Sequence, residues 1–146
     1  MSELSVEQAR LAQLWEEHMR HEFQTCSTED TIATMVEDAY VNHVPVMTGG
    51  VGHAELRQFY ATHFIPKMPP DMEMAPLSRT IGTEQLVDEM VVRFTHTVEM
   101  DWMLPGSRPP ESGSRSRWLS SFISATVSSR TNISTGTKPQ CWRSSG

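Results

Sequence analysis

Residues 84–102 read EQLVDEMVVRFTHTVEMDW, and this stretch decides the fold. Apolar side chains fall on one parity of the stretch and mostly polar side chains on the other, with Val87 and Val91 as exceptions. A period of two over this length predicts a long strand with one buried face and one face in water. Asp88 and His96 are polar residues on the apolar parity, and a sheet face of that kind can line a small-molecule pocket.

The composition bounds the class of protein. The chain has 146 residues, enough for one domain with a hydrophobic core, and its net charge of -6 argues against a nucleic-acid partner. It has no apolar run of membrane-spanning length, residues 1–17 lack the pattern of a secretory signal, and Cys26 and Cys141 form no metal-binding spacing. These features favour a cytoplasmic protein with reduced thiols, no membrane contact, no metal and no cofactor.

A change in composition at Gly106 divides the chain. Residues 1–106 contain six basic and seventeen acidic residues, whereas residues 107–146 contain six basic residues, one acidic residue and twelve serines. All six histidines and all ten methionines precede the boundary. The sequence therefore predicts a folded domain over residues 1–106 and a serine-rich tail, disordered or irregular, over residues 107–146.

Two helices are predicted at the start of the chain. Ser5 and Gln8 form a capping box, and apolar residues at helical spacing continue the first helix to about Gln24. Ser27 or Thr28 caps a shorter second helix, which has acidic residues in its first turn.

A mixed series of elements follows. Residues 38–47 are β-rich, residues 48–52 form a glycine turn, and residues 53–63 predict a third helix that ends at prolines. Residues 72–81 read as a weak strand, and a turn at Gly82 leads into the long strand. This order predicts an α+β fold with three N-terminal helices on one face of a curved antiparallel sheet.

Several segments resemble the SnoaL-like branch of the nuclear-transport-factor-2-like superfamily. They are YVNHVP, GGVG, LRQFY and RFTHTVEMDWMLPG, and the similarity covers about residues 8–106. More closely, the chain is similar to the small domain found alone or attached to dienelactone-hydrolase (carboxymethylenebutenolidase)-type proteins. The resemblance implies a cone, in which helices close a bent sheet around a pocket, and a homodimer for an intact domain.

The resemblance implies catalytic roles for His43 and His96. His43 matches a histidine that commonly faces the cone, and His96 lies on the apolar parity of the long strand. Either imidazole could act as a general acid or base, because its usual pKa lies near neutral pH. Without the resemblance, a lone histidine on an apolar face is usually a core residue with a satisfied hydrogen bond. The residues expected to line the pocket are Trp15, Tyr40, Tyr60, Asp88, Phe94 and Trp102.

The family contains polyketide cyclases, ketosteroid isomerases, dehydratases and members that only bind or dimerise. The implied activity is therefore an acid–base isomerase, cyclase or dehydratase, or an accessory lactone hydrolase, acting on a small hydrophobic substrate. The alternative is a non-catalytic ligand-binding or dimerisation module. The sequence contains no nucleophile elbow or phosphate loop, so hydrolysis by this chain alone lacks a visible nucleophile.

Residues 107–146 depart from the family pattern. The family continues with a proline-threonine-glycine turn and two long strands, the last containing a segment like HEHIYWDQASVL, which this chain lacks. Reading from the third base of each codon into the first two bases of the next gives a shifted codon at each junction of residues 130–142. At every junction the genetic code allows the matching residue of HEHIYWDQASVL. This agreement indicates a frameshift, which would truncate the domain after its third strand and remove an aspartate that the family places in the last strand. Activity would then be impaired.

Overall fold

The computed structural model describes residues 3–44 and 46–111, together with the backbone of residues 118–128 and 133–140. The helices are α1 (Val6–Phe23), α2 (Thr28–Ala33) and α3 (Gly52–Phe59), which continues as a π-helical turn, η1 (Tyr60–Phe64), and a 3-10 turn, η2 (Ile65–Lys67). The strands are β1 (Tyr40–Val44), β2 (Thr48–Val51), β3 (Glu73–Ile81), β4 (Gln85–Thr95), β5 (Trp118–Ser128) and β6 (Ile133–Gln140).

The two predicted helix caps are confirmed. The Ser5 hydroxyl accepts a hydrogen bond from the Gln8 backbone N–H at 3.2 Å, and the Gln8 side chain accepts from the Ser5 backbone N–H at 2.9 Å. The Ser27 hydroxyl accepts from the Asp30 backbone N–H at 3.3 Å. Each cap satisfies an N–H group that the first helical turn would otherwise leave without a partner.

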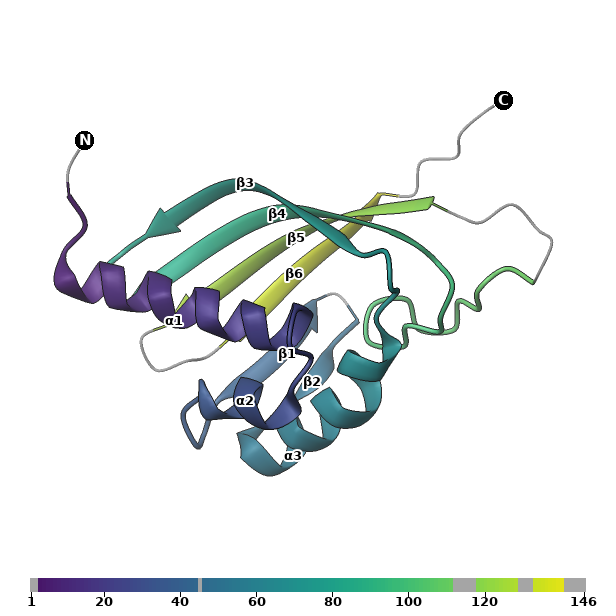
Figure 1. Cartoon of the computed structure of the whole chain (residues 1–146), viewed down its shortest axis with the longest axis horizontal. Coiled ribbons are helices and arrows are strands. Elements are labelled where there is room, and N and C mark those ends of the chain that lie inside the picture. Colours follow the sequence, from purple (N-terminus) through teal and green to yellow (C-terminus); the bar gives the residue numbers. More distant parts are fainter. Residues whose placement is uncertain (1–2, 45, 112–117, 129–132, 141–146) are drawn as a thin grey trace.

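One six-stranded sheet runs through the domain, in the order β2-β1-β6-β5-β4-β3 (Figure 1). Strands β1 and β6 are parallel, and all other neighbours are antiparallel. The sequence predicted three strands followed by truncation, whereas the described backbone contains two further strands within residues 107–146. Strands β5 and β6 occupy the middle of the sheet, because β1 and β4 each pair with one of them.

Strand β4 has the alternation that the sequence predicts. From Leu86 to Phe94 every second residue is buried, and Asp88 is among the buried ones. The strand ends at Thr95, seven residues before Trp102, because the Asp71 carboxylate accepts the Thr95 backbone N–H at 3.0 Å and the chain then turns.

The predicted continuation of this strand to Trp102 is therefore wrong. Residues 100–104 form a turn in which Met100 O accepts from the backbone N–H groups of Met103 and Leu104. Met100 and Trp102 are buried in this turn, which reproduces the alternation without a strand.

The expected glycine turn at residues 48–52 is instead strand β2 and the start of α3. Gly49 has a φ of +144°, and a Cβ atom there would lie 1.9 Å from the Val41 carbonyl oxygen. Only glycine permits β2 to approach β1 this closely, so the residue read as a turn signal is a packing requirement of the sheet.

The core lies between the sheet and the helices that cover one face of it (Figure 1). The Trp15 side chain, on α1, contacts Asp88 of β4, and the Gln8 side chain donates to the Ile81 carbonyl at the end of β3. Aromatic residues of α3 and η1 fill the other end of this layer. Within the described residues, no helix is long and apolar enough to span a membrane.

Candidate functional site

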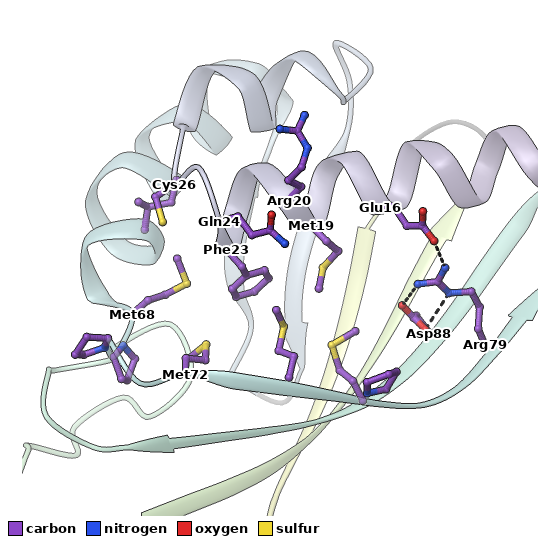
Figure 2. A pocket seen from close by; sticks show the side chains of 16 residues that line it. Glu16, Met19, Arg20, Phe23, Gln24, Cys26, Met68, Met72, Arg79 and Asp88 are labelled. Atoms are coloured by element: carbon purple, nitrogen blue, oxygen red, sulfur yellow. Dashed lines mark hydrogen bonds and ion pairs between the residues drawn. The ribbon is translucent and has the colours of Figure 1, made fainter.

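A cavity of about 700 Å³ lies between α1, the segment that follows η1, and strands β3 and β4. Figure 2 shows Met19 and Phe23 reaching into it from α1, with Met68 and Met72 on another side. Five of the ten methionines line the cavity: Met19, Met68, Met72, Met74 and Met90. Unbranched thioether side chains adapt to ligands of irregular shape, so this lining suits a small apolar molecule.

One end of the cavity is charged. Arg79 donates to Asp88 at 3.2 Å and 2.9 Å and to Glu16 at 2.8 Å (Figure 2). Trp15 Nε1 donates to Asp88 Oδ2 at 2.7 Å, and this is the oxygen that Arg79 contacts at 2.9 Å. The hydrogen bonds to Asp88 raise the pKa of Arg79; partial burial opposes this rise and Glu16 adds to it. Two carboxylates and one guanidinium thus meet at a single wall of the cavity, and Arg20 and Gln24 add polar groups from α1 and its C-terminal end.

The residues predicted to line one pocket lie in several different places in the structure. Asp88 lines the cavity, and Trp15 lies behind it through the indole hydrogen bond. Phe94 is a buried core residue, and Tyr40 is 40% exposed. Trp102 is buried in the turn after β4 and lines a different pocket.

Tyr60, which was predicted to line the pocket, belongs to a buried polar network. Its hydroxyl donates to Glu22 Oε1 at 2.6 Å, and His18 Nε2 lies 3.0 Å from the same oxygen. The other ring nitrogen of His18 lies 2.6 Å from the Thr34 hydroxyl. Burial raises the pKa of Tyr60 well above its usual value, and the Glu22 charge and hydrogen bond raise it further. This phenol therefore stays protonated and joins α1 to η1.

His43 is buried on β1, against the rings of Phe59, Phe64 and Trp102. Its Nδ1 lies 3.0 Å from the Thr48 carbonyl, so Nδ1 carries the proton in the neutral ring. Burial lowers the pKa of His43, although the Thr48 hydrogen bond and the Glu22 charge act in the opposite direction. The imidazole is therefore neutral near pH 7.

His96 follows the end of β4 and is 2% exposed. Neither His96 nor His43 is among the residues that line the 700 Å³ cavity. The described geometry joins Asp88 to the cavity and leaves the two histidines outside its lining.

Sequence reasoning missed Arg79 and Glu16 at the cavity, and it missed a histidine–carboxylate pair elsewhere. His63 Nδ1 lies 2.9 Å from Asp101 Oδ2, and Lys67 donates to the same oxygen at 3.1 Å. In the part of the chain that the structure describes, no group of three or more His, Cys, Asp or Glu side chains is placed to hold a metal ion.

Comparisons with known proteins concern the fold. No protein-family model matches this chain, and no curated protein matches its sequence. Solved structures do match it over nearly its whole length, at low identity. An NTF2-like protein from Anabaena variabilis is 12% identical with a TM-score of 0.63, and the match covers 96% of this chain and 94% of that one.

Two further matches have names that mention chemistry. A ketosteroid isomerase-like protein from Erwinia carotovora atroseptica is 14% identical with a TM-score of 0.55, covering 93% of this chain and 98% of that one. SalBIII, an epoxide hydrolase/cyclase-like enzyme with a role in pyran ring formation in the polyether salinomycin, is 11% identical with a TM-score of 0.56, covering 90% and 92%. This chain has a mixed helix-and-strand fold similar to that of the NTF2-like and ketosteroid isomerase-like proteins.

Proposed function

We propose that this chain binds a small, mainly apolar molecule in the 700 Å³ cavity. The observation that carries the proposal is the lining of that cavity, in which five methionines surround the space and one wall is charged. Ligand sites of this volume are commonly apolar with a few convergent polar groups. The apolar part of the ligand would lie against the thioethers, and its polar group would lie at the Glu16–Arg79–Asp88 wall.

A fluorescence titration with 2-naphthol tests the proposal. Met74→Trp places an indole in the cavity, and we expect it to weaken the affinity about tenfold or more because the ligand loses its space. Leu77→Trp is the matched control on the same strand, since Leu77 is 52% exposed and does not line the cavity. Equal affinity of Met74→Trp and the unchanged chain would place the ligand elsewhere.

A second candidate function is acid–base catalysis in the same cavity, as an isomerase, cyclase, dehydratase or accessory lactone hydrolase. The observation that favours it is the sharing of one guanidinium by two carboxylates, Glu16 and Asp88, at the cavity wall. Such a pair can divide the roles of proton donor and proton acceptor. The names of the ketosteroid isomerase-like and epoxide hydrolase/cyclase-like structures are compatible with this chemistry.

Turnover of epoxides and of β,γ-unsaturated ketones, with Asp88→Asn and Glu16→Gln beside the unchanged chain, tests the second candidate. We expect weak turnover, because residues 107–146 contain no Asp, His or Tyr that could add to the site. Loss of that turnover in Asp88→Asn, with 2-naphthol still bound, would support catalysis. Rates in Asp88→Asn and Glu16→Gln equal to that of the unchanged chain would leave binding as the function of this cavity.

We also propose His43 and His96, which lie outside the lining of the cavity, as acid–base residues. The fixed tautomer of His43 supports this role, since its Nε2 carries the lone pair when Nδ1 donates to Thr48. His43→Gln and His96→Gln should each lower any turnover of the substrates above about a hundredfold if they transfer protons. A loss in Asp88→Asn alone would assign the chemistry to the carboxylates.

We also propose that the domain is cone-shaped and forms a homodimer. A second proposal is a reading-frame change before residues 107–146. The domain encoded without that change would be of the dienelactone-hydrolase-associated type. The codon compatibility of residues 130–142 supports the frame change. Sequencing the transcript across the Gly106 codon tests it, and sedimentation equilibrium tests the dimer. If the shifted reading frame of the transcript does not encode the family-like segment, the frame change is rejected. A molecular mass equal to that of one chain would reject the dimer.

A further inference from the structure

A second pocket of about 280 Å³ lies at the opposite side of the aromatic core from the methionine-lined cavity. Met47, between β1 and β2, and Thr48, at the start of β2, line it on one side. The other lining residues include Phe59 of α3, His63 of η1, and Asp101 and Trp102 of the turn after β4. This pocket and the 700 Å³ cavity share no lining residue. The second pocket is therefore a separate site from the 700 Å³ cavity.

His63 and Asp101 form an oriented pair at this pocket. The Asp101 carboxylate holds His63 Nδ1 at 2.9 Å and also accepts from Lys67 at 3.1 Å. Partial burial raises the pKa of Asp101, but the bonds from His63 and Lys67 lower it overall to below its usual value. Asp101 is therefore ionised near neutral pH, and it accepts the Nδ1 proton of the neutral imidazole. The lone pair of that imidazole is then on Nε2.

The turn that carries Asp101 is fixed in place. The Thr48 hydroxyl donates to the Trp102 carbonyl at 2.7 Å, and the Trp102 ring packs on Phe64 with a centroid distance of 4.6 Å. Asp101 Oδ1 is buried and has no hydrogen-bond partner among the described residues. The carboxylate thus directs its bonds through Oδ2, toward His63 and Lys67, from a turn anchored to β2.

The surroundings of the pair are partly apolar. Met47, Phe59 and Trp102 form the walls beside it, while the His63 side chain is 45% exposed and can be reached from solvent. Among the described residues, Asp101 on the turn forms the ion pair with the imidazole, and Lys67 of η2 contacts the same Asp101 oxygen. A histidine held by a carboxylate next to an apolar wall has the arrangement that general-base catalysis requires.

We propose that His63 is the general base of a second site, which removes a proton from a small, flat, mainly apolar molecule. Nε2 takes a C–H or O–H proton, and the electron pair of that bond stays with the substrate. Asp101 stabilises the imidazolium that forms, and the imidazolium then returns its proton to water or to the product. The step needs no nucleophile, oxidant or second substrate.

The probe is 5-nitrobenzisoxazole, whose elimination is triggered by a base alone. The base takes the C–H proton, the C–H electron pair forms the nitrile, and the N–O bond breaks to release a coloured phenolate. We expect His63→Gln to lower kcat/KM about tenfold or more, within the range that a positioned general base contributes. His21→Gln is the matched control, because His21 also lies near carboxylates, at 3.9 Å, but lines a different pocket.

Two more variants separate a catalytic role from a structural one. Asp101→Asn should lower kcat while leaving KM nearly unchanged, since an amide does not stabilise the imidazolium that forms during proton transfer. Met47→Trp should raise KM by blocking the pocket, and Met47 is 68% exposed, so the change removes little buried surface. Leu77→Trp, at an exposed position of β3 that lines neither pocket, should leave the rate unchanged.

The proposal fails if His63→Gln, with an unchanged thermal melt, keeps more than half of the rate. It also fails if Asp101→Asn leaves kcat unchanged. If His63→Gln does not fold, Met47→Trp provides the test. An unchanged KM in Met47→Trp would reject the claim that the substrate binds in this pocket.

Discussion

Trp15 and Trp102 offer a matched pair for measuring what one buried indole N–H contributes. Both side chains are 2% exposed, but Trp15 Nε1 donates to Asp88 at 2.7 Å, whereas Trp102 Nε1 has no hydrogen-bond partner in the described part of the chain. Both Trp→Phe changes remove the same atoms. We expect Trp15→Phe to lower the free energy of unfolding by about 1.5–3 kcal/mol more than Trp102→Phe, because its bond is to a charged group. Urea unfolding of both variants measures the difference, and equal losses would contradict the assigned hydrogen bond.

His43 gives a prediction about pH. Because burial lowers its pKa in the folded state, the unfolded chain binds a proton that the folded chain does not. Stability should therefore fall as pH decreases through the usual histidine value, between about pH 7 and pH 5. His43→Gln should flatten this part of the stability curve relative to the unchanged chain. Parallel curves for the two chains across that interval would show that another group titrates.

At the scale of single residues, periodicity found Asp88 but could not find its partners. Asp88 interrupts a clear alternation, so its burial could be read from the sequence. Arg79 lies on a strand without such a pattern, and Glu16 lies on the polar side of a helix, 63 residues away from Arg79. His63 and Asp101 meet across 38 residues. Contacts of this kind depend on the packing of whole elements, which local patterns do not encode.

At the scale of elements, the caps predicted α1 and α2, apolar helical spacing before prolines predicted α3, and the alternation after a turn at Gly82 predicted the β3–β4 hairpin. The end of β4 and the strand β2 could not be predicted, and the reason is the same in both cases. The turn at residues 100–104 buries apolar side chains at an alternating spacing, and Gly49 serves a close strand contact rather than a turn. Burial and glycine content are ambiguous signals until the neighbouring element is known.

Gly49 and Gly106 separate the two costs of replacing such a glycine. At Gly106 φ is +75° and an added Cβ would meet nothing within 4 Å, so Gly106→Ala should lose only about 1–2 kcal/mol from left-handed backbone strain. At Gly49 the added Cβ would also lie 1.9 Å from the Val41 carbonyl oxygen. We expect Gly49→Ala to destabilise the domain far more than Gly106→Ala in thermal melts. A loss in Gly49→Ala no greater than in Gly106→Ala would contradict the β1–β2 contact.

At the scale of the whole molecule, the second part of the chain occupies the centre of the sheet. Strand β5 pairs with β4 along its whole length, and β6 lies between β5 and β1. A chain that stops at residue 111 leaves β1 and β4 with open edges, whose backbone donors and acceptors can pair with other chains. We expect it to lose its cooperative thermal transition and to aggregate. A cooperative melt at the temperature of the full chain would mean that β5 and β6 contribute little to stability.

The methionines allow the most direct test of the central claim that the 700 Å³ cavity binds a small apolar molecule. Carbon-13 labelling of the methionine methyl groups gives one NMR signal for each side chain. Addition of 2-naphthol should shift the signals of the five methionines that line the cavity: Met19, Met68, Met72, Met74 and Met90. It should leave the signals of Met35, Met100 and Met103 in place, since none of them lines it. Shifts confined to Met47 or to the buried Met100 and Met103, with the five cavity signals unmoved, would contradict the account.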